Sequence, residues 1–397
     1  MKNRYWIFGA LILAASPALA ERPAPPPSPV TAGKSASSNV THEAVLAARA
    51  FLATFDPRHR GEVQFPFVLQ HSGPSARTRR TGPDQSSAPV TGVPRQTVIQ
   101  QGPGPGSPVN VIGERYGMAV WSGFPVNEGF RPGVQINRLT PDQRAAALRL
   151  LQTLLSAGGY RTVQDVMEAD QALTNKATPF VSGKATYSIA IFGQPSDTAP
   201  WMVQFGGRHL GLNIVIEGTH TVMAPRLTGA HPSAYRRGDR TIRILAEEND
   251  RAFAFLDSLD PAQRQQAILP YTVEDIVQGP GHGGETLVPE GIRGSALNAA
   301  QKDRLMELIG AWVGIMNDAY AAPRMREIRQ ELDETWFAWS GPTTHEPGVA
   351  GSSYYRIQGP RLLIEFSPQH AGAHTAPEVH TVYQDPTNSY GSRLSIP

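Results

Sequence analysis

The segment "NEGFRPGVQINRLTPDQRAAALRLLQTLL" (127–155) decides the fold, because the chain repeats its pattern as "PEGIRGSALNAAQKDRLMELIGAWV" (289–313). A second related pair stands before these copies: "RAFLATFDPRHRGEVQFPF" (49–67) and "FAFLDSLDPAQRQQAILPY" (253–271). Both pairs keep the same order along the chain, which chance similarity rarely does. Internal similarity of this kind indicates one structural unit used more than once. The sequence therefore predicts two copies of a single unit.

Each copy contains a capped amphipathic helix. Thr140 precedes Pro141 in the first copy, and Asn298 holds the matching place in the second. Thr and Asn side chains accept hydrogen bonds from the first N–H groups of a helix, and Pro fits the first helical position. Apolar residues then follow with helical spacing and give each helix one face to bury. They are Leu148, Leu151, Leu154 and Leu155 in the first copy, and Met306, Ile309, Trp312 and Val313 in the second.

Shorter predicted helices (162–173 and 323–332) lead in both copies to predicted strands. The strands are rich in β-branched and aromatic residues and are bordered by Gly or Pro. They cover 187–193, 200–205 and 210–218 in the first copy, and 335–341, 353–359 and 361–366 in the second. The predicted fold class is α+β, with two tandem helix-then-antiparallel-sheet repeats packed about a pseudo-twofold axis in one globular unit. Either repeat alone would leave a sheet face or edge uncovered.

The predicted boundaries are 41–232 for the first repeat and 245–393 for the second. The first repeat is longer because of residues 71–110, which are rich in Pro, Gly and Ser. Such a composition cannot bury a core, so we expect a surface insertion that is largely disordered.

The N-terminus has the pattern of a cleavable export signal over residues 1–20. Lys2 and Arg4 precede the apolar run 5–15, and Ala18 and Ala20 make a small-residue cleavage site. Residues 21–40 are rich in Pro, Ser and Ala and are expected to form a disordered tether. No later segment approaches the roughly 20 apolar residues of a membrane-spanning helix. We therefore expect a periplasmic or secreted protein without a transmembrane segment after cleavage.

Composition narrows the function classes. The chain has no cysteine, which excludes disulfides, thiolate zinc sites and iron–sulfur clusters. Lys and Arg number 36 against 34 Asp and Glu, and the signal removes two of the basic residues, so the mature chain is formally neutral. Nucleic-acid-binding proteins usually carry a basic face. We expect a small-molecule ligand or substrate and no nucleic acid.

Histidines and acidic residues gather in the segment "HAGAHTAPEVHTVYQDPTNSYG" (370–391). Within it, "EVHTV" (378–382) matches "GTHTV" (218–222) of the first repeat. The match predicts that His220 and His380 are equivalent. Imidazole and carboxylate groups suit a divalent transition metal, with zinc as the first candidate. The predicted metal ligands are His209, His282, His374, His380 and Glu365, with Glu378 or Asp385 as general base or as a group that orients a ligand. These residues predict a metal-dependent, hydrolytic enzyme. Histidines beside Gly and Pro are also common as hydrogen-bonding loop residues, which is the alternative interpretation. The sequence contains no His-Glu-x-x-His motif of zinc proteases.

The alternative function is a non-catalytic binding protein for a small organic anion or sugar. It would use Arg208 for charge and the aromatic rings of Trp201, Trp339 and Tyr355 as contact surfaces. The run "TWFAWSG" (335–341) reads first as a buried strand and second as a ligand platform. A third possibility is a scaffold in which the histidines satisfy buried backbone groups.

Four segments together resemble the domain-of-unknown-function family 3500: 201–232, 333–342, 354–369 and 379–391. Block 56–67 is similar to the family's N-terminal segment, so the resemblance extends over roughly 42–393. The family is functionally uncharacterised, so the resemblance implies a shared fold and no particular activity.

The resemblance also implies a pattern of histidines. The family pattern has two adjacent histidines after a glycine and a His-x-His-Thr-Val segment near the end. His209 and His380 match it, whereas Arg208 and Glu378 stand where the pattern has the other two histidines. Glutamate can bind a metal and arginine cannot. An altered site is therefore expected, and it is one that could pair an anionic ligand with Arg208.

Overall fold

The computed structural model describes residues 36–67, 69, 77–79, 96–101, 109–124, 129–174, 183–282, 285–344, 353–369 and 377–394. The chain divides into two units, Met1–Lys34 and Ser35–Pro397, and all described residues belong to the second. The expected signal peptide, most of the expected tether and His374 lie outside the described residues. Residues 36–40, which the sequence placed in the tether, are helical. None of the described helices combines the length and apolar composition that a membrane crossing requires.

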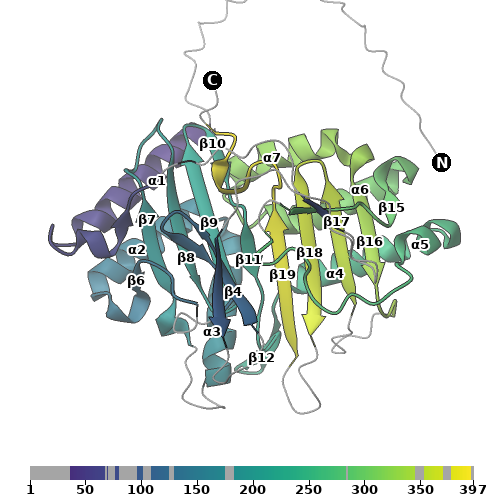
Figure 1. Cartoon of the computed structure of the whole chain (residues 1–397), viewed down its shortest axis with the longest axis horizontal. Coiled ribbons are helices and arrows are strands. Elements are labelled where there is room, and N and C mark those ends of the chain that lie inside the picture. Colours follow the sequence, from purple (N-terminus) through teal and green to yellow (C-terminus); the bar gives the residue numbers. More distant parts are fainter. Residues whose placement is uncertain are drawn as a thin grey trace, which may run out of the picture. The chain divides into compact units, whose positions relative to one another are not determined.

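A twelve-stranded mixed sheet forms the centre of this unit (Figure 1). Its order is β1-β7-β8-β9-β11-β19-β18-β17-β16-β15, with β6 beside β7 and β10 beside β9. Neighbouring strands are antiparallel except for the parallel pair β1–β7. The bounds are β1 Gln64–Phe65, β6 Val134–Gln135, β7 Ser188–Phe192, β8 Trp201–Gly207, β9 Leu210–Glu217, β10 His220–Val222, β11 Arg226–Thr228, β15 Ile292–Arg293, β16 Trp336–Ser340, β17 Tyr354–Gly359, β18 Leu362–Gln369 and β19 Glu378–Gln384.

Helices lie behind this sheet in Figure 1, and the strand β4 crosses in front of it. The described α-helices are α1 Ala36–Ala53, α2 Pro141–Leu154, α3 Ala157–Thr174, α4 Ala246–Asp257, α5 Pro261–Ala267, α6 Ala299–Val313 and α7 Asp318–Gln330. The front layer contains β3 Gln96–Gln101, β4 Val109–Tyr116 and β5 Ala119–Trp121. Two short pairs complete the fold: β2 Arg77–Arg79 with β14 Glu285–Leu287, and β12 Ala234–Arg237 with β13 Arg240–Arg243. Within the expected insertion at 71–110 the structure describes β2, β3 and the start of β4, and the other residues of the insertion lie outside the described ones.

The predicted helix starts are confirmed. Thr140 accepts a hydrogen bond from the backbone N–H of Gln143 and caps α2, and Asn298 does the same for Gln301 at α6. In both cases the glutamine side chain returns a bond to the capping residue, which satisfies two N–H groups at each helix start. The six strands predicted from 187–218 and 335–366 are also present, as β7 to β9 and β16 to β18.

The sheet separates two apolar cores, and this separation positions the polar sites. Successive side chains of a strand point to opposite faces. On β19, Val379 and Tyr383 pack with the helices, whereas Val382 packs with Trp121 of the front layer. Glu378 and His380 alternate along the strand with Val379 and Tyr383. Their side chains therefore point to the same face as Val382, in front of the sheet.

Candidate metal centre

His209 occupies a strained turn that many contacts hold in place. It lies in the two-residue connection between β8 and β9 with a φ of 58°, a left-handed conformation that costs a residue other than Gly about 1–2 kcal/mol. Its N–H donates to the carbonyl of Gly123 at 2.8 Å, and its carbonyl accepts from the N–H of Gly229 at 2.7 Å. The preceding carbonyl, of Arg208, accepts from the Tyr187 hydroxyl at 2.7 Å. These bonds fix the imidazole, which is only 8% exposed.

Gly229 brings this turn against β19. A Cβ at this position would lie 2.4 Å from the carbonyl oxygen of Val379, so only glycine fits. Next to it, Ala230 and Val379 exchange two backbone hydrogen bonds of 3.0 and 2.9 Å. The beginning of β19 is thereby fastened beside the His209 turn, although the two segments are far apart in sequence.

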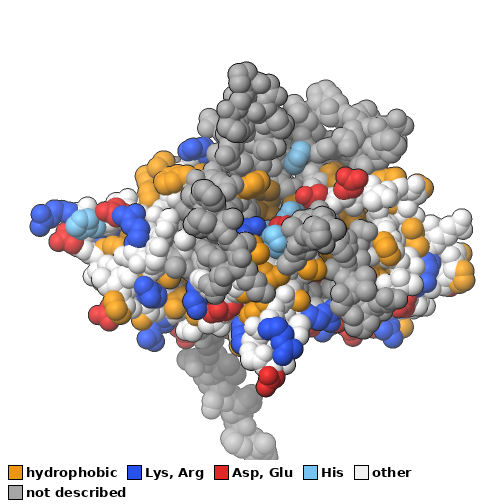
Figure 2. All heavy atoms as spheres, turned by 90° about the horizontal axis from the view of Figure 1, so that it is seen from below, with side chains coloured by type: hydrophobic (Ala, Val, Ile, Leu, Met, Phe, Trp, Pro, Cys, Tyr) orange, Lys and Arg blue, Asp and Glu red, His pale blue; other side chains and the backbone are white. Residues whose placement is uncertain are grey.

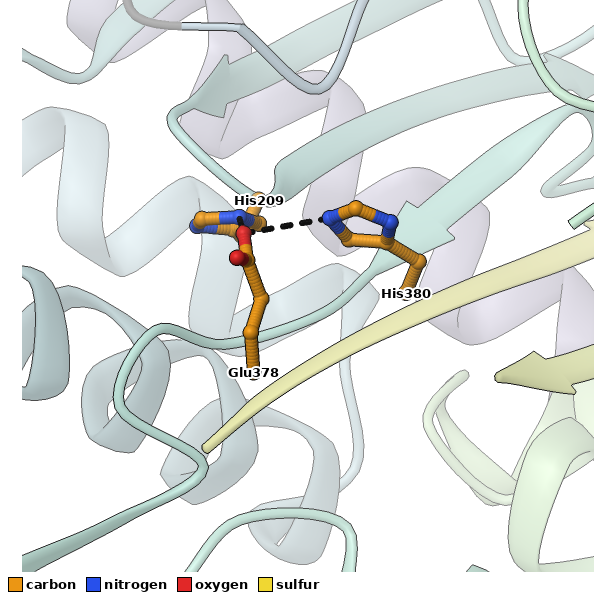
Figure 3. A group of neighbouring side chains, drawn as sticks. All are labelled: His209, Glu378 and His380. Carbon is orange, nitrogen blue, oxygen red and sulfur yellow. Dashed lines mark hydrogen bonds and ion pairs between the residues drawn. The ribbon is translucent and has the colours of Figure 1, made fainter. Parts of the chain in front are cut away.

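Three side chains meet at this point: His209, Glu378 and His380 (Figure 3). Oε1 of Glu378 lies 2.5 Å from Nε2 of His209 and 3.1 Å from Nε2 of His380. The two imidazole rings are nearly parallel, with centroids 5.6 Å apart. One candidate ligand atom from each residue lies within 4.8 Å of the others. This geometry could hold one metal ion.

Two further residues complete the surroundings of the group. Asp275 accepts a hydrogen bond of 2.9 Å from Nδ1 of His380. Nδ1 of His231 lies 3.5 Å from Oε2 of Glu378 and 3.2 Å from Nη2 of Arg208. Figure 2 shows histidine side chains beside acidic and basic ones near the middle of one face of the molecule. His380 is 30% exposed and Glu378 15%, so the group is reached from solvent.

The charge state of the group follows from burial and hydrogen bonding. Burial lowers the pKa of His209 to about 4, so this imidazole is neutral at pH 7. Burial opposes protonation of His380 too, but its bonds to Asp275 and Glu378 outweigh this and raise its pKa to about 9. Burial alone would raise the pKa of Glu378, whereas the bonds from both histidines hold it well below its usual range. An anionic glutamate therefore lies between a neutral and a cationic histidine.

The donor set fits a divalent transition metal. Two imidazole nitrogens and one carboxylate oxygen are a common three-residue ligand set of catalytic zinc. Asp275 holds the Nδ1 proton of His380, which leaves Nε2 for a metal, as second-layer carboxylates do in metal sites. Nδ1 of His209 has no partner within the described part of the chain. Only one of the two histidines thus has its outer nitrogen anchored.

The other predicted ligands and acid–base groups lie elsewhere. Glu365 is fully buried and accepts bonds from the N–H groups of Val277 and Gln278 and from the Tyr354 hydroxyl, so it fastens a loop. Asp385 forms an ion pair of 3.0 Å with Arg324. His282 lies in the segment between α5 and β14, outside the group, and His374 is outside the described residues. His220, which the sequence predicts to be equivalent to His380, is exposed on β10 and is not part of the group.

The aromatic residues expected to contact a ligand are core residues. Trp201, Trp339 and Tyr355 are at most 1% exposed and belong to the main core. Their rings contact other core rings, as in the Trp339–Tyr355 stack. Arg208 does lie near the group formed by His209, Glu378 and His380, because its guanidinium contacts the neighbouring His231. The same guanidinium lies 3.9 Å from a carboxylate oxygen of Asp170. The predicted set of one arginine and three rings is therefore not assembled in one place.

The family comparison covers the whole group. The family model described as "Protein of unknown function (DUF3500)" matches residues 114–392, which include His209, Glu378 and His380. The block 56–67 lies outside the matched range. No curated protein and no solved structure matches the chain. A match over this much of the sequence shows that the chain belongs to the DUF3500 family.

Proposed function

We propose that this protein is an exported hydrolytic enzyme that uses one divalent transition metal, with zinc as the first candidate, on a small-molecule substrate. The observation that carries the proposal is the convergence of His209, Glu378 and His380 on one point. Three protein ligands leave a coordination position for water or substrate. A metal in such a site lowers the pKa of bound water and polarises a substrate carbonyl or phosphoryl group.

The residues around the ion would have distinct roles. Asp275 would orient His380 and raise its basicity as a ligand. Glu378, which the sequence placed as a general base, is better used as a ligand, because Oε1 already lies between both Nε2 atoms. Arg208, which contacts His231, would place a positive charge near a substrate bound to the metal.

We also propose that the two halves arose by duplication and pack about a pseudo-twofold axis. The element order supports this: each half runs through a 3₁₀ turn, two helices, another 3₁₀ turn and three antiparallel strands. The junctions α2–α3 and α6–α7 pair antiparallel through Leu155 and Met316. Their hydrogen bonds are reciprocal, from Ser156 N–H to the Ile315 carbonyl and from Asn317 N–H to the Leu154 carbonyl.

Metal analysis tests the function. The mature chain should be purified without a histidine tag, and its metal content measured by mass spectrometry. We expect about one transition-metal ion per chain, lost in His380→Ala and retained in His220→Asn, whose side chain is exposed and outside the group. No bound metal, together with unchanged thermal stability of His380→Ala, would sink the proposal. Bound metal without hydrolysis of ester, amide or phosphoester substrates would favour a binding protein.

A further inference from the structure

A cavity of about 580 Å³ lies on the helical face of the sheet, among α3, the start of α4 and α6. Its walls include Gly159, Arg226, Leu245, Trp312 and Ile315. Arg226 pairs with Tyr383 of β19 in the sheet register. The cavity is therefore on the opposite side of the central strands from the metal centre. Its volume is in the range of small-molecule sites, roughly 300–1,000 Å³.

Arg226 is a buried cation that forms no ion pair with any described residue. Its side chain is 1% exposed, and within the described residues no carboxylate lies at ion-pair distance from its guanidinium. Nη2 donates to the carbonyl of Trp312 at 2.8 Å, and the guanidinium lies over the Tyr383 ring at 4.4 Å. Nε has no partner among the described residues. Burial lowers the pKa of Arg226 to about 10, which reflects the cost of a buried, uncompensated charge.

The start of α4 adds a second attraction for an anion. Its N-cap residue Leu245 has a φ of 56° and no side-chain cap, and Ala246, Glu247 and Glu248 line the cavity. The first N–H groups of a helix have no partner inside the helix and carry a partial positive charge. A left-handed leucine is itself costly, so the surrounding structure must hold it.

Charges on the cavity wall are otherwise largely matched. Arg251 pairs with Glu247 at 2.5 Å, and Arg243 pairs with Asp250 at 2.7 Å. Glu248 is the exception, since burial raises its pKa to about 7 and weakens its ability to neutralise Arg226. A purely structural role for Arg226, tying β11 to the last turn of α6, explains the bond to Trp312. It does not explain why Nε lacks a partner among the described residues, nor the open volume.

We propose that this cavity binds a small organic anion, with a carboxylate or phosphate group on Arg226 and the start of α4, and with an apolar body against Trp312 and Ile315. A guanidinium and a helix start both recognise either headgroup. An inorganic ion would fill only a small part of about 580 Å³. The site is independent of the metal centre and should persist in protein treated with a chelator.

Calorimetric titration of the mature chain tests this site. The probes are benzoate, phenyl phosphate, inorganic phosphate and the neutral benzamide. We expect one saturable site for benzoate or phenyl phosphate, weaker binding of inorganic phosphate, and no binding of benzamide. The preferred headgroup separates carboxylate from phosphate ligands. Chelator treatment should leave the affinity unchanged.

Variants locate the binding. Arg226→Gln should weaken binding at least tenfold, and Glu248→Gln should strengthen it because it removes a negative charge from the wall. Ala311→Phe should block the cavity while leaving Arg226 in place, which keeps the test valid if Arg226→Gln fails to fold. Arg236→Gln, an exposed arginine on β12, is the matched control and should bind as the wild type does. Absence of saturable anion binding, equal binding of benzamide, or wild-type affinity in Ala311→Phe would each overturn the proposal.

Discussion

Strands β11 and β19 have polar sites on both faces of the sheet, and the two sites differ in how they are satisfied. In front, Glu378 accepts bonds from His209 and His380, so the charges are matched within the group. Behind, Arg226 contacts the Trp312 carbonyl, the Met223 sulfur and the Tyr383 ring, and no described carboxylate lies at ion-pair distance from it. In the front group, hydrogen bonds from the two imidazoles already satisfy the carboxylate, and a metal ion could take the place of the protons between them. The proposed anion would supply the charge behind the sheet that no described carboxylate supplies at ion-pair distance.

The largest effect should come from Gly229, which joins the His209 turn to β19. Gly229→Ala would place a methyl group 2.4 Å from the Val379 carbonyl, so the backbone must shift. We expect a loss of about 2–4 kcal/mol in the free energy of unfolding and loss of metal binding. Urea denaturation and metal analysis measure both. Gly61→Ala, where a Cβ meets no atom within 4 Å, is the control and should change stability by less than about 0.5 kcal/mol. Equal stability of the two variants would show that the turn is not fastened in this way.

His209→Asn separates the ligand from the turn it occupies. Asparagine tolerates the left-handed conformation, so the backbone should stay while the imidazole is lost. We expect metal affinity to fall more than about 100-fold, because losing a ligand should cost more than losing an outer partner. His209→Ala should lose the metal equally and be less stable than the Asn variant by about 1 kcal/mol. Competition with a chromophoric chelator gives the affinities, and anion binding behind the sheet should not change. Tight metal binding in His209→Asn would remove this residue from the site.

Asp275→Asn tests the outer partner of His380. The carboxylate accepts the Nδ1 proton and raises the basicity of the ring. We expect the metal affinity to fall about 10–100-fold with the fold intact. The same chelator competition, with circular dichroism as the check on folding, measures this. An unchanged affinity would mean that Asp275 contacts His380 without supporting a metal.

Local signals predicted much of the fold. The caps at Thr140 and Asn298 and the strands β7 to β9 and β16 to β18 depend on neighbouring residues, and these were found in the sequence. The pseudo-twofold packing stays a prediction. The sequence could not decide whether Trp201 and Trp339 are buried in the core, because alternation along a strand does not show which faces of the sheet will be covered.

The site was only partly predictable because it is assembled from distant segments. His380 came from the histidine-rich tail and its match to His220, His209 was a further candidate that also fits the family pattern, and Glu378 was noted as an acid–base group rather than as a central ligand. Asp275 and His231 carry no local motif, and only the crossing of β19 beside the His209 turn brings them together. Arg226 gave no signal at all, since a single arginine in a short strand is usually solvated.

Glu248→Gln should leave metal binding unchanged and alter stability only at higher pH, and it sharpens the difference between the two faces. The folded-state pKa of Glu248, about 7, lies above its ordinary value of 4.5 because of burial, so the folded protein holds the proton more tightly than the unfolded chain does. The stability linked to this proton is complete below pH 4.5 and is lost as the pH rises through 7. The glutamine variant should therefore be more stable than the wild type at pH 8 by about 1–2 kcal/mol, allowing for partial exposure, and equally stable at pH 4. Unfolding curves at both pH values decide this, and a variant that is less stable at pH 8 would show that the Glu248 charge compensates Arg226 after all.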